Sequence, residues 1–197
     1  NFAEVEIYTG VEDVVIAEIK NVHLYKNYLV NDRFIVEQQG KAPIGYTTSG
    51  DVSVNMIHSA SLEQGDYNSA KITSTADKTS YAKKSFDKTG GKVVIESYIL
   101  LDDTQNDGEV AFTAYCADVP VLTVKTSNNA WYAVNNNEDV KLRDINPEIW
   151  QRIRIEADTA TQTAMIRVNG KKVAENVPFL VKADGFDAVE VSYAANA

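Results

Sequence analysis

Aromatic rings and amide groups lie close together in residues 130–137. Trp131 and Tyr132 are adjacent, and Asn135 and Asn137 follow within a few residues. Proteins bind sugars by packing aromatic rings on the apolar faces of the sugar and by bonding its hydroxyl groups to amides and charged side chains. The stretch therefore predicts a ligand site of this kind. In the alternative interpretation, one of the two rings points into the core and the asparagines only form a turn.

Arginines alternate with apolar residues in residues 150–156. If this run is a strand, Ile153 and Ile155 point inward, while the arginines and Glu156 point outward. Arginine binds carboxylates through paired hydrogen bonds, so an outward basic strip favours an acidic polysaccharide. In the alternative, Glu156 and neighbouring acids neutralise the arginines as cross-strand pairs. The strip would consist of Arg152, Arg154, Arg167 and Lys125.

Polysaccharide lyases need a base, commonly Tyr or His, and a group that neutralises the uronate carboxylate. Tyr98 and Tyr115 lie in strand-like runs and could act as the base, while Arg152 and Arg154 could neutralise the carboxylate. We place all four among the ligand-binding residues and none among the catalytic ones.

Retaining glycosidases need two carboxylates about 5 Å apart. Glu4 and Glu6 share one face of a predicted strand, but their alternation with apolar residues is typical of a solvent-exposed face. Glu96 stands alone in its strand, with no evident partner. We therefore expect no catalytic residue.

Acidic loops provide candidate ligands for calcium, which takes six to eight oxygen atoms. Asp102, Asp103 and Asp107 lie in one such loop, and Asp32 lies near the predicted start of the domain. A structural Ca²⁺ ion is the cofactor that these residues suggest; the alternative is acidic loops without a metal. The single cysteine, Cys116, allows no intrachain disulfide and is expected to be a buried thiol.

The overall charge of the chain argues against one class of partner. The formal net charge is -9, with a sequence pI near 4.7. Such a charge opposes binding to nucleic acid, which depends on contacts with phosphates. No apolar run approaches the roughly 20 residues that would span a bilayer, so we expect no membrane partner. We expect a secreted or extracellular protein, either free or attached to a cell surface. We also expect the chain to be a piece of a longer polypeptide.

Short strands separated by turns dominate the sequence. Alternation is clearest in residues 3–8 and 150–156, and Asn169-Gly170 predicts a two-residue hairpin turn. Many short strands with frequent turns are typical of a sandwich or barrel. Further strands are predicted at residues 14–25, 52–58, 70–75, 81–86, 92–101, 110–117, 121–125, 131–134, 163–168, 171–173 and 188–193.

The two ends of the chain are similar to each other. Phe-Ala-Glu-Val-Glu-Ile at residues 2–7 matches Phe-Asp-Ala-Val-Glu-Val at residues 186–191 in spacing and residue type. We therefore divide the chain into residues 1–28, closing strands that belong to a preceding repeat or to a permuted final strand, and residues 29–197, the sandwich module. In the alternative, the ends are adjacent edge strands of similar composition.

Residues 150–173 resemble the concanavalin A-like lectin/glucanase superfamily. They share a Trp at position 150, an alternating strand, an acidic residue before a turn and a strand that ends in Asn-Gly. Residues 31–34, 43–48 and 80–86 are similar to strands and a loop of laminin G-like and carbohydrate-binding modules of secreted bacterial polysaccharide-degrading enzymes. The resemblance covers about residues 29–193. It implies two curved sheets, carbohydrate on or beside the concave sheet, and often a structural calcium ion.

The sequence thus predicts an all-β fold, a two-sheet antiparallel jelly-roll β-sandwich with little helix. The resemblance is informative about fold and not about activity, since the superfamily contains lectins, hydrolases, lyases and protein-binding modules. We expect a non-catalytic polysaccharide-binding module, whose partners are the polysaccharide and the other domains of the same polypeptide. The alternatives are a structural or adhesive repeat of a cell-surface protein, and a catalytic lyase or hydrolase on the same fold.

Overall fold

The computed structural model describes residues 29–195, apart from 31, 33, 35–36, 59–65, 74–77, 102–107, 137 and 148. Residues 1–28, with their predicted strands and their similarity to residues 186–191, lie outside the described part. Within that part every regular element is a strand. It contains no helix that is long and apolar enough to cross a membrane.

The strands form three sheets. The largest has seven strands in the order β1-β4-β13-β6-β7-β8-β9, the second has four in the order β12-β11-β10-β5, and β2 pairs with β3. Every pairing is antiparallel. The strands are β1 (Thr47–Ser49), β2 (Asp51–His58), β3 (Asp66–Thr73), β4 (Thr79–Thr89), β5 (Lys92–Ile99), β6 (Gly108–Cys116), β7 (Val119–Ser127), β8 (Ala130–Ala133), β9 (Val140–Asp144), β10 (Gln151–Asp158), β11 (Thr163–Val168), β12 (Lys171–Pro178) and β13 (Phe186–Ala195).

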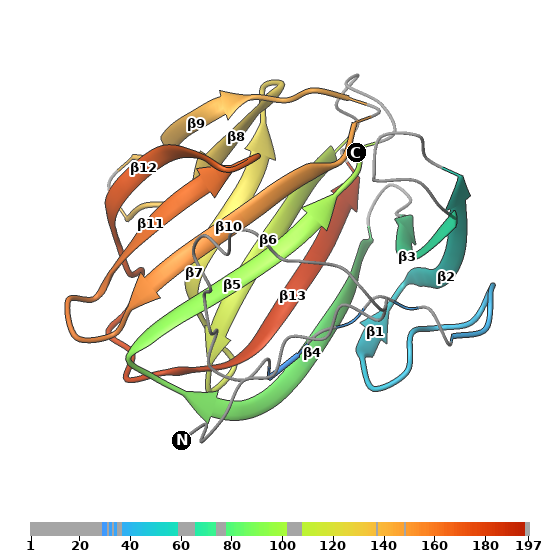
Figure 1. Ribbon diagram of the computed structural model, residues 1–197, viewed down its shortest axis with the longest axis horizontal. Helices are drawn as coiled ribbons and strands as arrows, with labels where there is room; N and C mark the ends of the chain where they lie inside the picture. Colours follow the sequence, from blue (N-terminus) through green and yellow to red (C-terminus); the bar gives the residue numbers. More distant parts are fainter. Residues whose placement is uncertain are drawn as a thin grey trace, which may run out of the picture.

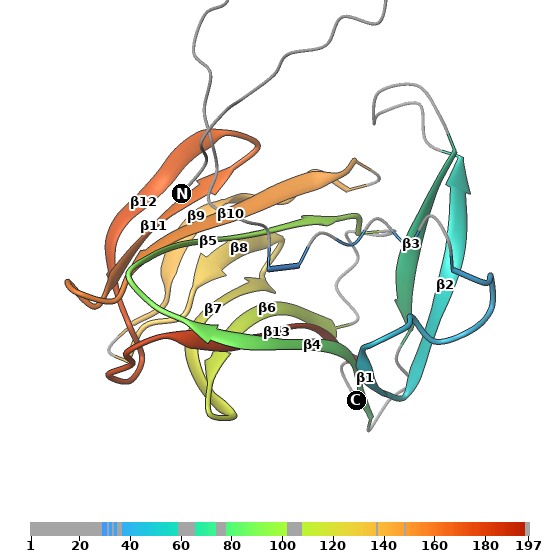
Figure 2. The ribbon, with the colours of Figure 1, turned by 60° about the horizontal axis from the view of Figure 1, so that its bottom comes forward.

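The two larger sheets lie face to face as two layers. Figure 1 shows β5, β10, β11 and β12 in front of the seven-stranded sheet, and Figure 2 shows the same strands above β4, β13 and β6. The hairpin of β2 and β3 stands beside this pair of layers, where the backbone N–H of Asp51 donates to Ser80 Oγ of β4 at 3.2 Å. The described residues therefore form an all-β jelly-roll sandwich, as the sequence predicts.

Apolar side chains of both sheets meet between the layers. In β10 the residues Gln151, Ile153, Ile155 and Ala157 are buried, while the residues between them are partly exposed. Burial of each large apolar side chain stabilises the fold by roughly 1.5–3 kcal/mol. The largest fully buried apolar side chains include Trp131, Phe186, Ile153, Ile155 and Ile166.

Local predictions are confirmed where local chemistry decides the structure. Asn169 and Gly170 connect β11 to β12 with positive φ angles of 50° and 76°, as expected for this two-residue hairpin turn. The predicted strands that fall within the described residues are present, with shifted ends. Two strands were not predicted, β1 and β9, which are three and five residues long. In β9 only Leu142 is buried, so its apolar signal is weak.

Candidate functional site

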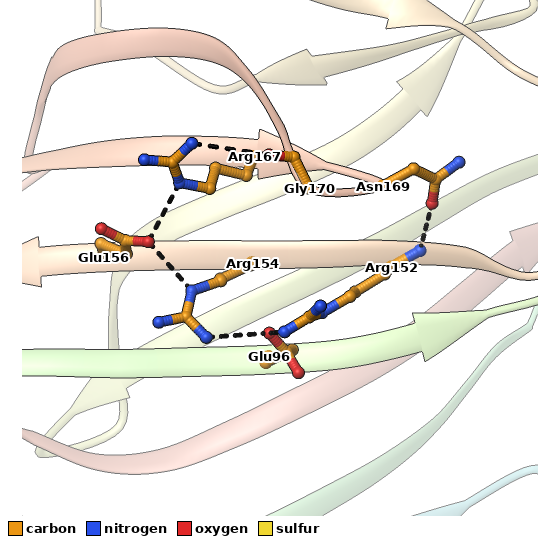
Figure 3. Close-up of polar contacts among 7 residues, drawn as sticks. All are labelled: Glu96, Arg152, Arg154, Glu156, Arg167, Asn169 and Gly170. Carbon is orange, nitrogen blue, oxygen red and sulfur yellow. Dashed lines mark hydrogen bonds and ion pairs between the residues drawn. The ribbon is translucent and has the colours of Figure 1, made fainter. Parts of the chain in front are cut away.

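The outward face of the four-stranded sheet bears the predicted arginines. Arg152 and Arg154 lie on β10, and Arg167 lies opposite Arg154 on β11. The face also bears Glu96 of β5, which is paired with Arg154, and Glu156 of β10. Figure 3 shows these side chains joined by dashed contacts in a chain in which arginine and glutamate alternate.

Each of these carboxylates bonds two arginines. Glu96 accepts from Arg152 Nη2 at 2.8 Å and from Arg154 Nη1 at 3.3 Å. Glu156 accepts from Arg154 Nε at 2.9 Å and from Arg167 Nε at 3.1 Å. Burial alone would raise the pKa of Glu156, but its hydrogen bonds to Arg154 and Arg167 lower it. We call these five residues the arginine–glutamate ladder.

The ladder corrects two predictions. Glu96 is not a lone carboxylate, because antiparallel pairing of β5 with β10 brings Arg152 and Arg154 to it. Lys125 does not join the arginines, because it lies on β7 of the other sheet. The arginines are thus neutralised by ion pairs with Glu96 and Glu156, the alternative that the sequence left open.

Tyr98 lies at the edge of the ladder on β5. Its side chain is 47% exposed, and the Arg152 guanidinium carbon lies 5.9 Å from its ring centroid. Trp131, another ring that the sequence predicts to bind ligand, does not reach the surface. Trp131 is 0% exposed and its Nε1 donates to Gln151 Oε1 at 2.9 Å, so it belongs to the core and cannot pack on a ligand.

The outward face of the seven-stranded sheet lies below β4, β13 and β6 in Figure 2. This face bears tyrosines. Cross-strand pairing aligns one row of residues across β4, β13, β6, β7, β8 and β9. We call it the tyrosine row. It consists of Tyr81, Ser192, Ala111, Lys125, Tyr132 and Lys141.

A polar row runs beside the tyrosine row. It consists of Lys83, Glu190, Thr113 and Thr123, which are aligned across β4, β13, β6 and β7. The hydroxyl groups of Thr113 and Thr123 are 3.1 Å apart and share a hydrogen bond. The two rows are separated by two residues along each strand, or about 7 Å.

Tyr115 borders the polar row on the side away from the tyrosine row. Its hydroxyl donates to Glu190 Oε1 at 3.1 Å, and Lys83 Nζ lies 4.3 Å from its ring centroid. Burial and the negative charge of Glu190 raise the pKa of Tyr115 to about 12. Burial also raises the pKa of Glu190, although Tyr115 and Lys83 act in the opposite direction. The phenol is therefore a hydrogen-bond donor held in a fixed direction.

Tyr81 and Tyr132 are partly exposed and stand at the two sides of the tyrosine row. They lie on β4 and β8, four strand spacings apart, or about 19 Å. Between them lie Ser192 and Ala111, whose side chains are small, and Lys125, whose side chain is 24% exposed. Such an arrangement offers aromatic faces and hydroxyl groups to one extended ligand.

The remaining predicted residues are dispersed. Asn135 is half-buried after β8, where its N–H donates to Asp139 Oδ1 at 3.2 Å, whereas Asn137 lies outside the described residues. Asp32 forms an ion pair with Lys84, at 3.1 Å. No group of three or more potential metal ligands occurs in the part of the chain that the structure describes. Asp102, Asp103 and Asp107 lie outside that part, so the calcium ion stays a prediction for their loop.

Of the ring residues predicted to bind ligand, the structure brings Tyr115 and Tyr132 to one face and Tyr98 to the other. Sequence reasoning missed Tyr81, Lys83 and Glu190. Alternation within residues 81–86 would have placed Tyr81 and Lys83 on one face. Nothing local, however, indicates that β13 inserts between β4 and β6.

Known proteins resemble this chain in structure and not in sequence. No family model and no curated protein matches it. The carbohydrate recognition domain of Emp47p has a TM-score of 0.53 at 14% identity, with 84% of this chain and 85% of that chain covered. An uncharacterized protein from Mycobacterium paratuberculosis has a TM-score of 0.54 at 12% identity, with 86% and 89% covered.

A sialidase has a TM-score of 0.52 at 8% identity, and the match covers 77% of this chain but only 13% of the sialidase. At such low identities the likeness shows the fold alone. The chain shares the β-sandwich fold of these solved structures.

Proposed function

We propose that this chain binds a polysaccharide across the outward face of the seven-stranded sheet and does not cleave it. The observation that carries the proposal is the cross-strand alignment of Tyr81 and Tyr132, both partly exposed, on one row with Ser192, Ala111 and Lys125 between them. The ring faces would pack on the apolar faces of successive sugars, and the partly exposed members of the polar row, Lys83, Thr123 and Glu190, would bond their hydroxyl groups. The Emp47p structure with the same fold is described as a carbohydrate recognition domain.

The groups around Glu190 support binding without catalysis. A retaining glycosidase needs a second carboxylate about 5 Å from the first. The cross-strand neighbours of Glu190 are Lys83 and Thr113, and its neighbours on the same face of β13 are Ala188 and Ser192. A lyase needs a tyrosine that gives up its proton readily, yet Tyr115 donates to Glu190 and its pKa is raised to about 12.

The arginine–glutamate ladder is a weaker candidate for the same role. Its arginines bond Glu96 and Glu156, so a ligand would have to displace ion pairs before gaining its own. We assign the ladder to the stability of the four-stranded sheet.

We also propose that the chain acts as an accessory module of a longer secreted protein. The match to the sialidase supports this, because there a similar fold makes up 13% of a much longer chain. In such a protein the module would hold polysaccharide close to the other domains.

The test is binding of the purified chain to a panel of polysaccharides by affinity electrophoresis and calorimetry. Tyr81→Ala and Tyr132→Ala are each expected to weaken binding roughly five- to tenfold, since a stacked ring is worth about 1–1.5 kcal/mol. Tyr98→Ala is the matched control, because it removes a tyrosine that is 47% exposed on the opposite sheet. It should leave binding unchanged.

Two outcomes would overturn the proposal. One is the absence of binding to every polysaccharide by a chain that is shown to be folded. The other is a loss of binding in Tyr98→Ala with none in Tyr81→Ala and Tyr132→Ala, which would place the site on the four-stranded sheet. Circular dichroism of each variant separates loss of the site from loss of the fold.

A further inference from the structure

The charges around the tyrosine row distinguish between classes of polysaccharide. Lys83 bonds Asp118 at 2.7 Å, and Lys141 bonds Asp144 at 2.7 Å. Each of these lysines thus has a carboxylate partner within the protein.

Lys125, at the centre of the row, is enclosed by two acids. It contacts Glu109 at 3.3 Å and Asp139 at 3.2 Å. Although burial alone would lower the pKa of Lys125, Asp139 and Glu109 raise it, so the ammonium group is strongly held in its charged form. Together with Glu190, five carboxylates of the described residues therefore surround three lysines on this face.

The carboxylates are also the more accessible members of these pairs. The side chain of Asp118 is 91% exposed, whereas that of Lys83 is 16% exposed. Glu109 is 47% exposed, whereas Lys125 is 24% exposed. A polyanion that approaches the sheet would meet exposed carboxylates before it reached a lysine, and the net charge of -9 adds long-range repulsion.

The spacing of the rings indicates the length of the ligand. A ligand that contacts both Tyr81 and Tyr132 must span about 19 Å across the strands, with Ser192, Ala111 and the stem of Lys125 beneath it. A single sugar cannot reach both rings. Contact with the two tyrosines therefore requires an extended oligosaccharide or a polymer.

We propose that the ligand of the tyrosine row is an uncharged, extended polysaccharide that runs across the strands from Tyr81 to Tyr132, and not a uronate polymer. This inference rests on the proposed function, since it names the class of glycan for the same surface. It differs from the acidic polysaccharide suggested by the arginines in the sequence, because those arginines lie on the other sheet in the arginine–glutamate ladder.

The first experiment compares neutral and acidic polymers, of which hydroxyethylcellulose and carboxymethylcellulose share the cellulose backbone. Hydroxyethylcellulose, galactomannan and starch are the neutral probes, and carboxymethylcellulose, polygalacturonate and alginate are the acidic ones. We expect binding to at least one neutral probe, and at low salt at least tenfold weaker binding to every acidic probe. High salt should narrow the difference, because it screens the repulsion.

A second experiment tests the cause of the discrimination. Asp118→Asn removes an exposed carboxylate and its ion pair with Lys83. In this variant binding to carboxymethylcellulose should increase severalfold relative to hydroxyethylcellulose. Glu175→Gln is the matched control, because it removes the carboxylate of the Lys172–Glu175 pair on β12, and it should change neither affinity.

The outcomes separate the inference from the proposed function. Tighter binding to an acidic probe, lost in Tyr81→Ala and Tyr132→Ala, would overturn the inference and leave the proposed binding surface intact. Equal affinity for monosaccharides and long oligosaccharides would overturn only the claim that the ligand extends from Tyr81 to Tyr132. No binding to any probe, neutral or acidic, would overturn the proposed function itself.

Discussion

The hydroxyl of Tyr115 on β6 donates a hydrogen bond to the carboxylate of Glu190 on β13, at 3.1 Å. The two residues are separated by 75 positions in the sequence, and the pairing of β6 with β13 brings them together. The bond joins two groups whose pKa values are both raised, chiefly by burial. It therefore connects the geometry of the tyrosine face to the pH dependence of the fold.

We expect Glu190→Gln to remove a pH-dependent part of the stability. Burial raises the pKa of Glu190 above its ordinary value of 4.5, so the folded state holds the proton more tightly than the unfolded state. The contribution of this group is fully present below pH 4.5 and is lost as pH rises through the raised pKa. We therefore compare the free energy of unfolding of the unmodified chain with that of Glu190→Gln. The first minus the second should fall as the pH rises from 4.5 through the raised pKa of Glu190. Urea denaturation at a series of pH values measures it, and a difference that rises with pH would contradict the assignment.

Gln151→Leu is expected to destabilise the fold by roughly 2–3 kcal/mol, because it leaves buried polar groups without partners. Gln151 is 1% exposed; its Oε1 accepts from Trp131 Nε1 at 2.9 Å and its Nε2 donates to the Asn146 carbonyl at 3.0 Å. The control is Gln38→Leu at an exposed position, which should change stability by less than about 0.5 kcal/mol. Equal effects of the two substitutions in urea denaturation would show that the buried network contributes nothing.

Sequence predicts those parts of this fold that depend on neighbouring residues. The alternation in residues 150–156 places Ile153 and Ile155 inside and the arginines outside, and the structure confirms both. Asn169-Gly170 predicts its hairpin because only the local backbone decides the turn. These features need no knowledge of which strands pair.

The candidate site depends on pairings between distant strands and so could not be predicted. Tyr81, Glu190 and Thr113 share one face only because β13, the last strand, lies between β4 and β6. Likewise, the sequence left open which of Trp131 and Tyr132 is buried. The choice depends on Gln151, twenty residues away, whose amide accepts the indole N–H inside the core.

Arg154→Met is expected to cost roughly 1–2 kcal/mol of stability, because Arg154 bonds both Glu96 and Glu156 and is only 20% exposed. Lys172→Met breaks an exposed pair with Glu175 and should cost less than about 0.5 kcal/mol. The pKa of Glu156 is lower in the folded chain than its ordinary value of 4.5. The stability that the ladder provides is therefore fully present at pH values above 4.5, and it is lost as the pH falls through the lowered pKa. Denaturation of both variants at neutral and acidic pH tests this. A penalty for Arg154→Met that grows on acidification would contradict it.

The turn between β4 and β5 carries the chain from one sheet to the other and contains two glycines with different constraints. A Cβ at Gly90 would collide with the backbone carbonyl of Asp184, whereas a Cβ at Gly91 would meet nothing within 4 Å but would stand at a φ of +79°. Gly90→Ala should therefore cost roughly 2 kcal/mol or more, since backbone atoms cannot move aside easily. Gly91→Ala should cost about 1 kcal/mol from its backbone conformation.

Substitution by asparagine distinguishes the two causes, because asparagine tolerates positive φ better than alanine but has the same Cβ. We expect Gly91→Asn to recover part of the stability that Gly91→Ala loses, and Gly90→Asn to recover none. Thermal or urea denaturation of the four variants gives the comparison. A recovery at position 90 equal to that at position 91 would show that backbone conformation, and not contact with Asp184, limits the residue at Gly90.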